Sequence, residues 1–256
     1  WKSVSLTIAG ASLLVVPLIY FFLKESPTSV GTTPYGAPDD WQPLPKSELS
    51  AFRLAIDTIA KAKSNRDFQI LFFTFFVCGL STNGLIGTHF IPAAHDHGMA
   101  EPVAASLLAL VGVFDVVGTL ASGYLTDKFD PRKLLFFYYG LRGLSLFLLP
   151  SILFSTLHPS TLVFVIFYGL DWVATVPPTL VLSRIVLGPN RGTIVYGWVF
   201  VAHQIGASTA AFGAAHSRVQ FGDYAIAFYI SAAMCIVSAL AVLQIAKGKS
   251  ASELRV

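Results

Sequence analysis

The stretch Gly112–Leu135, GVFDVVGTLASGYLTDKFDPRKLL, joins an apolar run to a group of charges. The apolar part carries one carboxylate, Asp115, near its middle, and the charged part contains Asp127, Lys128, Asp130, Arg132 and Lys133. Such a run suits the hydrocarbon core of a bilayer, where a charged side chain is costly and needs a partner or a function. The group of charges marks a turn at the membrane edge, which we call the charged turn.

The composition of the whole chain also indicates a membrane protein. Hydrophobic residues make up 54% of the 256 residues and charged residues 12%, whereas a soluble domain carries about 25% charged residues. Crossing a bilayer takes roughly 20 mostly apolar residues. Seven runs of this kind are found, at 4–23, 68–93, 102–124, 133–154, 161–183, 192–215 and 223–246. We predict an all-α fold, because lipid cannot satisfy free backbone groups and no alternating barrel strands are visible.

Basic residues alternate between the loops on the two sides of the predicted membrane. Lys and Arg number six in 24–66, none in 94–101, three in 125–133, none in 155–160, two in 184–191, one in 216–222 and three in the tail. This positive-inside bias predicts that the linker, the charged turn and the C-terminus lie in the cytoplasm. The chain is then a multi-pass protein of the plasma (cytoplasmic) membrane, and its net charge of +3 reflects topology rather than an acidic partner.

The chain begins with Trp1 and shows no cleavage-site pattern after its first apolar run, so we expect a fragment of a longer protein rather than a signal peptide. The expected parts are a first transmembrane helix at 1–23, a cytoplasmic linker at 24–66, a six-helix bundle at 67–246 and a cytoplasmic tail at 247–256. Within the linker, an amphipathic helix is predicted near 47–64, with Phe52, Ile56 and Ile59 on one face. A structural helix on the membrane surface and a regulatory docking site are the two interpretations.

Several classes of protein lack support. Cys78 and Cys235 lie in separate apolar runs without metal-ligand spacing, so neither a metal nor a cofactor is expected. Intramembrane enzyme motifs (paired Asp, His-Glu-x-x-His or Gly-x-Ser-x-Gly) are missing, and no nucleic-acid partner is expected. A seven-helix receptor fits the number of runs, but the last run has no Lys for a Schiff base and no Asn-Pro-x-x-Tyr, and the fourth run does not end in Asp-Arg-Tyr.

The charged turn resembles the signature loop of the major facilitator superfamily, G-x-x-x-D-[RK]-x-G-[RK]-[RK], in the copy between helices eight and nine. The matching residues are Gly123, Asp127, Lys128, Arg132 and Lys133, while Asp130-Pro131 stands where the pattern prefers Gly and a further basic residue. The resemblance covers essentially the whole chain as helices six to twelve. It implies that this loop stabilises one conformation by holding two halves of a transporter together; a basic membrane-edge turn is the alternative.

The resemblance implies a secondary active transporter that works by alternating access, as a symporter or an antiporter, with an N-terminal half of the same protein as partner. The segment is also similar to the monocarboxylate and oxalate/formate branch, in which helix eight carries an Asp with an Arg one turn later. Here Asp115 is followed by Thr119. We expect a proton-coupled carrier of a small organic anion, with efflux of amphipathic compounds as the alternative.

Four ionisable side chains lie near the centres of apolar runs: Asp115, Arg142, Asp171 and His203. Charges at this depth face the protein interior or a wet cavity. Arg142 and Asp171 lie on consecutive predicted helices at similar depth and can form a structural ion pair. The resemblance implies that Asp115, Asp171 and His203 are on cavity-lining helices and Arg142 on a supporting one. Asp115 is the main candidate for proton coupling, because a carboxylate held away from water can take up and release a proton.

Polar and aromatic neighbours complete the set of candidate substrate contacts. Gln204 follows His203, Trp172 follows Asp171, and Asn83 and His89 lie in the second apolar run. Each of them contacts substrate in one interpretation and packs or hydrogen-bonds to a neighbouring helix in the other. His89 is expected nearer the outer face, at the mouth of the cavity.

Overall fold

The computed structural model describes residues 2–24, 26–34, 37, 41–43 and 49–246, and all regular structure within these residues is helical. The chain separates into two units, Trp1–Lys46 with the last two residues, and Ser47–Leu254. The predicted cytoplasmic tail at 247–256, the start of the amphipathic helix at 47–48 and parts of the linker lie outside the described residues.

The first unit contains the predicted first membrane-spanning helix. Helix α1 runs over Lys2–Phe22, and its 21 residues are long and apolar enough to cross a bilayer. A short 3-10 helix, η1 (Pro27–Val30), follows, and the hydroxyl of its N-cap, Ser26, accepts a hydrogen bond from the Ser29 amide at 3.3 Å. The described part of this unit is therefore one spanning helix and one capped turn.

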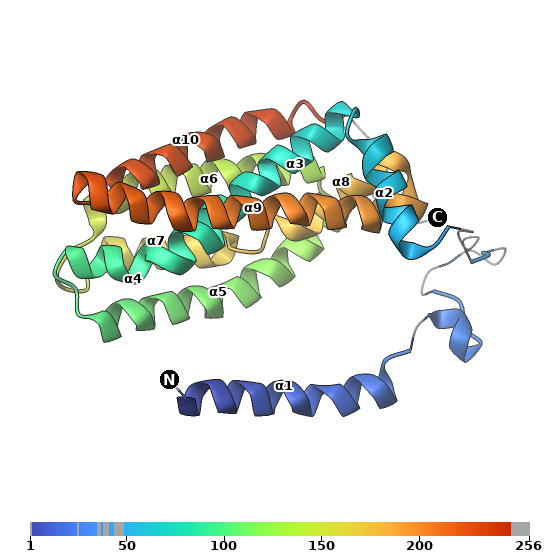
Figure 1. Ribbon diagram of the computed structural model, residues 1–256, viewed down its shortest axis with the longest axis horizontal. Helices are drawn as coiled ribbons and strands as arrows, with labels where there is room; N and C mark the ends of the chain where they lie inside the picture. The colour runs from blue at the N-terminus through green and yellow to red at the C-terminus, as the bar shows by residue number, and fades with distance from the viewer. Residues whose placement is uncertain (1, 25, 35–36, 38–40, 44–48, 247–256) are drawn as a thin grey trace. The chain divides into compact units, whose positions relative to one another are not determined.

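The second unit is a bundle of helices that run mostly along one direction (Figure 1). Its elements are α2 (Ala51–Ala62), α3 (Arg66–Gly79), the π-helical segment η2 (Leu80–Ile86), α4 (Gly87–Asp96), α5 (Glu101–Lys128), α6 (Pro131–Ile152), α7 (Pro159–Asp171), α8 (Val176–Leu187), α9 (Pro189–Phe221) and α10 (Ala225–Val242). Together with α1, six helical spans in the described residues are long and apolar enough to cross a membrane. The prediction of an all-α membrane protein is confirmed.

Helix α9 differs from the other spans. Its 33 residues are more than long enough to cross a bilayer, but it does not reach the apolar composition of the six. Its outward arc includes Gln204, Ser208 and Thr209, all exposed. The seventh predicted run is therefore a continuous helix with a partly polar surface, as expected of a helix that borders a polar space rather than lipid on every side.

Two of the predicted runs are not single regular helices. The second run is interrupted by the π-helical turns of η2, and the fifth is broken between α7 and α8. Pro177 and Pro178 lie in the first turn of α8, where missing amide hydrogens leave no intrahelical bond unmade. The four residues just before these prolines, 172–175, form turns instead of regular helix.

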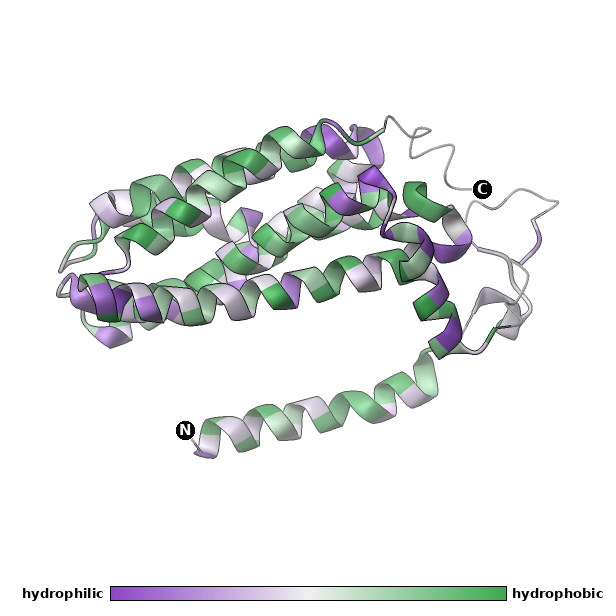
Figure 2. Cartoon of the chain, turned by 45° about the horizontal axis from the view of Figure 1, so that its top comes forward, coloured by the Kyte–Doolittle hydropathy of each residue, from purple (hydrophilic) through white to green (hydrophobic). Residues whose placement is uncertain are grey.

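Backbone-to-backbone contacts hold the helices together. A Cβ added at Gly79 would overlap the carbonyl of His203, and one added at Gly206 would overlap that of Phe76, so α3 and α9 nearly touch. Gly118 of α5 meets α7 in the same way. Small residues permit such approach in membrane helices. Figure 2 shows the helices hydrophobic over most of their length, with hydrophilic residues gathered near their ends and on α2.

Candidate functional site

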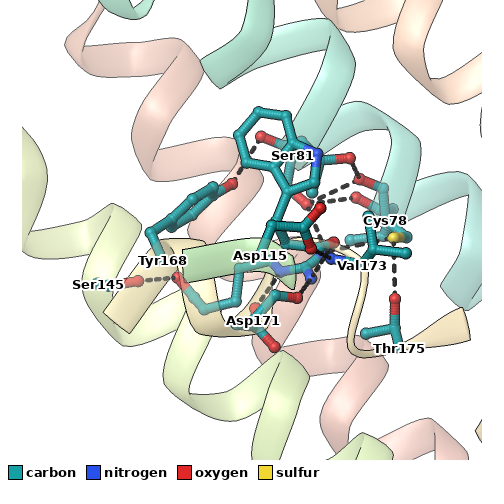
Figure 3. A network of polar contacts seen from close by, with 12 residues as sticks. Cys78, Ser81, Asp115, Ser145, Tyr168, Asp171, Val173 and Thr175 are labelled. Atoms are coloured by element: carbon teal, nitrogen blue, oxygen red, sulfur yellow. Dashed lines mark hydrogen bonds and ion pairs between the residues drawn. The ribbon is translucent and has the colours of Figure 1, made fainter. Parts of the chain in front are cut away.

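The break between α7 and α8 leaves four residues, 172–175, outside regular helix. We call this segment the helix break. Backbone groups freed in the hydrocarbon region must find partners within the protein. Side chains from α5 and α6 supply them, and side chains of α3 and η2 surround them; Figure 3 shows residues of this network close to the break.

Arg142 of α6 binds the carbonyl side of the break. Its Nη2 donates to the carbonyl oxygens of Asp171 and Trp172 at 2.6 and 3.2 Å, while Nε donates to the Asp171 carboxylate at 2.5 Å. The guanidinium is completely buried. A cation is favoured here because the carbonyls at a helix C-terminus carry partial negative charge. The ion pair that the sequence allowed is therefore present, and it also caps α7.

Asp115 of α5 binds the amide side of the break. Its Oδ1 accepts hydrogen bonds from the Val173 amide at 2.9 Å and from the Thr119 hydroxyl at 3.1 Å. The residue that replaces the expected Arg on α5 thus supports Asp115. One turn further along the same helix, Ser122 donates to the carbonyl of Ala174 at 2.5 Å. Three residues on successive turns of α5 therefore bind or support the break.

A second set of polar side chains connects the break to the π-helical segment. Cys78 Sγ lies 3.3 Å from Arg142 Nη1 and 3.3 Å from the Thr175 hydroxyl. Ser81 Oγ accepts from Arg142 Nη1 at 3.4 Å, and the Tyr168 hydroxyl donates to the Ser81 carbonyl at 2.8 Å. Since η2 itself departs from α-helical hydrogen bonding, two irregular segments meet around one guanidinium.

One carboxylate oxygen in this network is buried without a partner. Among the described side chains, Asp171 Oδ1 accepts no hydrogen bond, although Oδ2 pairs with Arg142. A cavity of about 200 Å³ between α6 and α7 reaches both residues, with Tyr138 and Ser145 in its wall. Unpaired buried polar atoms are uncommon and call for an explanation such as a bound water or a functional role. The arrangement leaves an acceptor at which a proton can bind.

His203 and its neighbours form a second group, which adjoins the first at Cys78. The His203 ring is 8% exposed, lies 5.2 Å from the Phe75 ring, and stacks on Phe200 at 5.4 Å. Its Nε2 lies 3.5 Å from the Asn83 amide nitrogen, while Nδ1 has no partner among the described residues. Asn83 and Gln204 are exposed. Two amide side chains therefore face outward beside a buried imidazole.

His89 and Trp172 both contact neighbouring helices or rings of the bundle. His89 is 7% exposed, its Nε2 is 2.8 Å from the carbonyl of Ala211, and its ring lies 5.2 Å from that of Tyr224. Trp172 is partly buried in the break, with its ring 5.7 Å from the Tyr168 ring. These contacts are compatible with the packing interpretation of both side chains.

In the charged turn, Asp130 and Arg132 form a compact cap for α6. The Asp130 carboxylate accepts from the Arg132 amide at 3.0 Å and from the guanidinium at 3.0 and 2.6 Å. The bonds from Arg132 hold the pKa of Asp130 below its usual range. Arg132 also donates to the carbonyl of Ile245 at 3.0 Å. The departure from the signature pattern at Asp130-Pro131 therefore serves to start α6 and to tie it to the end of α10.

The other residues of the signature pattern face outward. Lys128 Nζ lies 4.4 Å from the Tyr124 ring, and Asp127 and Lys133 are exposed. A Cβ at Gly123 would meet no atom of the described residues within 4 Å. No other helix therefore approaches this glycine closely within the described part of the chain.

Sequence analysis identified the charged members of the network but missed the neutral ones. Cys78, Ser81, Ser122 and Thr175 were not selected, because hydroxyl and thiol groups are tolerated throughout membrane helices and their spacing has no motif. The doublet Pro177-Pro178 was the available signal for the break. It marks the start of α8, but it does not reveal which helices bind the freed backbone.

Comparison with known proteins identifies the family. Residues 1–211 match the Major Facilitator Superfamily. An uncharacterized MFS-type transporter, YcxA, from Bacillus subtilis (strain 168) is 25% identical over 93% of this chain and 54% of its own length. Monocarboxylate transporter 12 from Xenopus laevis is 29% identical over 56% of this chain and 31% of its own length. Monocarboxylate transporter 12-B from Danio rerio is 30% identical over 46% of this chain and 25% of its own length.

The family match covers most of the chain, while the chain spans about half the length of the first of these relatives and less of the others. The all-helical bundle agrees with the match. This chain belongs to the major facilitator superfamily of membrane transporters.

Proposed function

We propose that this chain is part of a secondary active transporter that carries a small organic anion, such as a monocarboxylate, together with protons by alternating access. The observation that carries the proposal is the Asp115 carboxylate bound to the free Val173 amide in the helix break. Broken helices of this kind form the substrate and ion sites of many transporters. The names of two relatives, monocarboxylate transporters 12 and 12-B, support a carboxylate substrate.

Proton binding and anion binding are coupled because Asp115 and the substrate carboxylate compete for the Val173 amide. In the charged state, Asp115 accepts from the Val173 amide and so occupies the position that a substrate carboxylate needs. A proton on Asp115 removes its negative charge and weakens this bond, because a charged acceptor bonds more strongly than a neutral one. The substrate carboxylate then takes the Val173 amide. The proton and the anion therefore bind together, which is symport.

The net charge at the break also favours proton binding before anion binding. Asp115, Asp171 and Arg142 together carry one net negative charge when both carboxylates are ionised, which disfavours an anion at this depth. One proton brings the sum to zero, which removes the net negative charge that opposes the anion, and the anion can then approach the buried Arg142. Arg142 thereby supplies the cation that α5 lacks at Thr119. The unpaired Oδ1 of Asp171 is a second proton acceptor in this scheme.

The remaining candidates surround this centre. Asn83 and Gln204 are exposed amides that can hydrogen-bond the substrate, and His203 positions Asn83. His89 and Trp172 maintain the packing on either side. We assign these residues to a cavity shared with a second half of the same transporter, in line with the share of its relatives that this chain spans.

We place the chain in the membrane as helices six to twelve, with α2 as part of the linker between the halves. The charged turn, the start of α3 and the residues after α10 lie at one end of the bundle, joined by the bond from Arg132 to Ile245 and that from Arg66 to Gln244 at 2.5 Å. Positive-inside bias makes this end cytoplasmic, in the plasma membrane. The outward-facing residues of the charged turn, Gly123, Asp127, Lys128 and Lys133, then contact the other half in one conformation.

The test compares Asp115→Asn with Thr119→Val in proteoliposomes of the full-length transporter. Short-chain monocarboxylates are supplied under an imposed proton gradient. We expect the gradient to drive uptake by the wild type and by Thr119→Val. Asp115→Asn should lose gradient-driven uptake but retain substrate exchange, because the neutral Asn side chain resembles the protonated carboxyl and no proton is needed.

A thermal melt of each variant shows that folded protein is present. Gradient-driven uptake that survives in Asp115→Asn would contradict the role of this carboxylate. If the folded wild type takes up no monocarboxylate, efflux of amphipathic compounds becomes the better proposal. That alternative is favoured by an apolar cavity of about 470 Å³ between α6 and α7.

A further inference from the structure

An apolar pocket lies between α2 and α3, at the end of the bundle that carries the charged turn. Its volume is about 470 Å³. Ile59 of α2 and four phenylalanines of α3 form its walls, and two polar residues border it. The phenylalanines are Phe68, Phe72, Phe73 and Phe76, and the polar residues are Lys63 and Gln69. The Gln69 amide donates to the Lys63 carbonyl at 3.0 Å, which fixes the border. We call this the α2–α3 pocket.

Helix α2, which forms one wall of the pocket, is bonded to α9 on the side away from the pocket. Arg191 of α9 donates to the Asp57 carboxylate at 2.5 Å, and the Trp198 indole donates to the Ala55 carbonyl at 3.0 Å. Thr58 is completely buried. Hydrogen bonds from Lys61 and Arg191 hold the pKa of Asp57 below its usual range, so this contact stays charged at neutral pH.

The outward surface of α2 is apolar and basic. Phe52 and Ile56 are 77% and 46% exposed, one turn apart. Arg53 and Lys63 are exposed, whereas Asp57 is paired with Arg191. A helix with exposed apolar and basic residues next to spanning helices fits the interface between headgroups and acyl chains. The surface carries an excess of positive charge, so an anionic headgroup matches it better than a zwitterionic one.

We propose that the α2–α3 pocket binds one acyl chain of an anionic phospholipid, with its phosphate bound by Lys63. Three of the four phenylalanines, Phe72, Phe73 and Phe76, lie about two turns or more into a membrane-spanning helix, at the depth where acyl chains start, while Phe68 lies in its first turn. Lys63 lies just before that helix, at the level of the headgroups. The leaflet rests on the proposed orientation, which makes it the cytoplasmic one, where anionic lipids are concentrated. The lipid site itself does not depend on the transported substrate.

A lipid at this position would brace α2 against the bundle. The pocket is walled by α3, while α2 is tied to α9, the helix that carries His203. Lipid binding would therefore stabilise the contact between the linker helix and two helices of the candidate transport site. Stability should then depend on the headgroup, even without substrate.

The test uses native mass spectrometry of the purified full-length transporter in neutral detergent. The protein is offered an equimolar mixture of phosphatidylglycerol and phosphatidylcholine with matched acyl chains. We expect one phosphatidylglycerol to be retained in preference. Lys63→Gln should reduce this preference about fivefold, because one lysine near an anionic surface contributes that much to binding. Lys61→Gln is the matched control, since Lys61 lies on the same helix but pairs with Asp57 at 2.9 Å.

A second variant tests the pocket rather than the charge. Ile59→Trp fills the pocket from α2 and should reduce retention of both lipids while the protein still melts cooperatively. Equal retention of the two lipids by the wild type would overturn the anionic headgroup. A preference that Lys63→Gln leaves unchanged would overturn this location. A transporter that retains no lipid, or whose pocket is covered by another part of the protein, would overturn the proposal without affecting the transport test.

Discussion

At the scale of single residues, Arg142 connects several acceptors that no other side chain of the network binds together. It pairs with the Asp171 carboxylate, binds two carbonyls of the helix break and contacts Cys78 and Ser81. A planar guanidinium can serve all these acceptors at once, whereas an ammonium group cannot. The residue thus combines charge neutralisation with the capping of a broken helix.

Replacing Arg142 should lower the stability of the protein more than replacing a surface residue. Arg142→Met leaves the Asp171 carboxylate buried without a counter-charge, which costs about 3–5 kcal/mol in known cases. The double variant Arg142→Met with Asp171→Leu removes both charges and should recover part of that loss. It should not recover all of it, because the Trp172 carbonyl stays unpaired. Thermal melts in detergent measure both steps, and a single variant as stable as wild type would contradict the role of the pair.

At the scale of elements, sequence patterns found the helices but not their irregular segments. Apolar length placed all the spans within a few residues, because each one must cross the same hydrocarbon thickness. The break at 172–175 was missed because GLDWVATVPPTL has Asp171 as its one charge and continues an apolar run, and hydropathy does not report backbone hydrogen bonding. The ion pair could be anticipated from the depth of Arg142 and Asp171. The bond from Val173 to Asp115 could not, since it involves a backbone amide.

Helix α5 offers a matched test of close packing between elements. Gly118 faces the backbone of α7, where an added Cβ would overlap the Leu170 carbonyl, whereas a Cβ at Gly112 meets nothing within 4 Å. Gly118→Ala should therefore cost about 1–3 kcal/mol of stability and shift Asp115 away from Val173. Gly112→Ala on the same helix should be neutral or stabilising by up to about 1 kcal/mol. Melts of the two variants give the comparison, and equal stability would show that α5 and α7 can separate at little cost.

At the scale of the whole bundle, ion pairs and a hydrogen bond connect the helices at both ends, while the network around the break connects them in the middle. One end is tied by Asp57 to Arg191 and by Arg132 to the end of α10. At the other end, Arg218 of α9 donates two bonds of 2.7 Å to the Asp96 carboxylate at the end of α4. These end pairs lie in partly exposed positions, where acid can reach them, so they make stability depend on pH.

The pair at Asp96 gives that dependence a definite direction. The Arg218 guanidinium holds the pKa of Asp96 below its usual range, so the unfolded chain binds a proton more readily than the folded one. The stabilisation is therefore complete above the unfolded pKa of about 3.9 and is lost as pH falls below it. Asp96→Asn should lower the melting temperature at pH 7, and the gap to wild type should close between about pH 4 and pH 2. Glu101→Gln, a few residues away at the start of α5, should run parallel to wild type across the series. A constant gap for Asp96→Asn down to the lowest pH would mean that the contact between α4 and α9 does not depend on this charge.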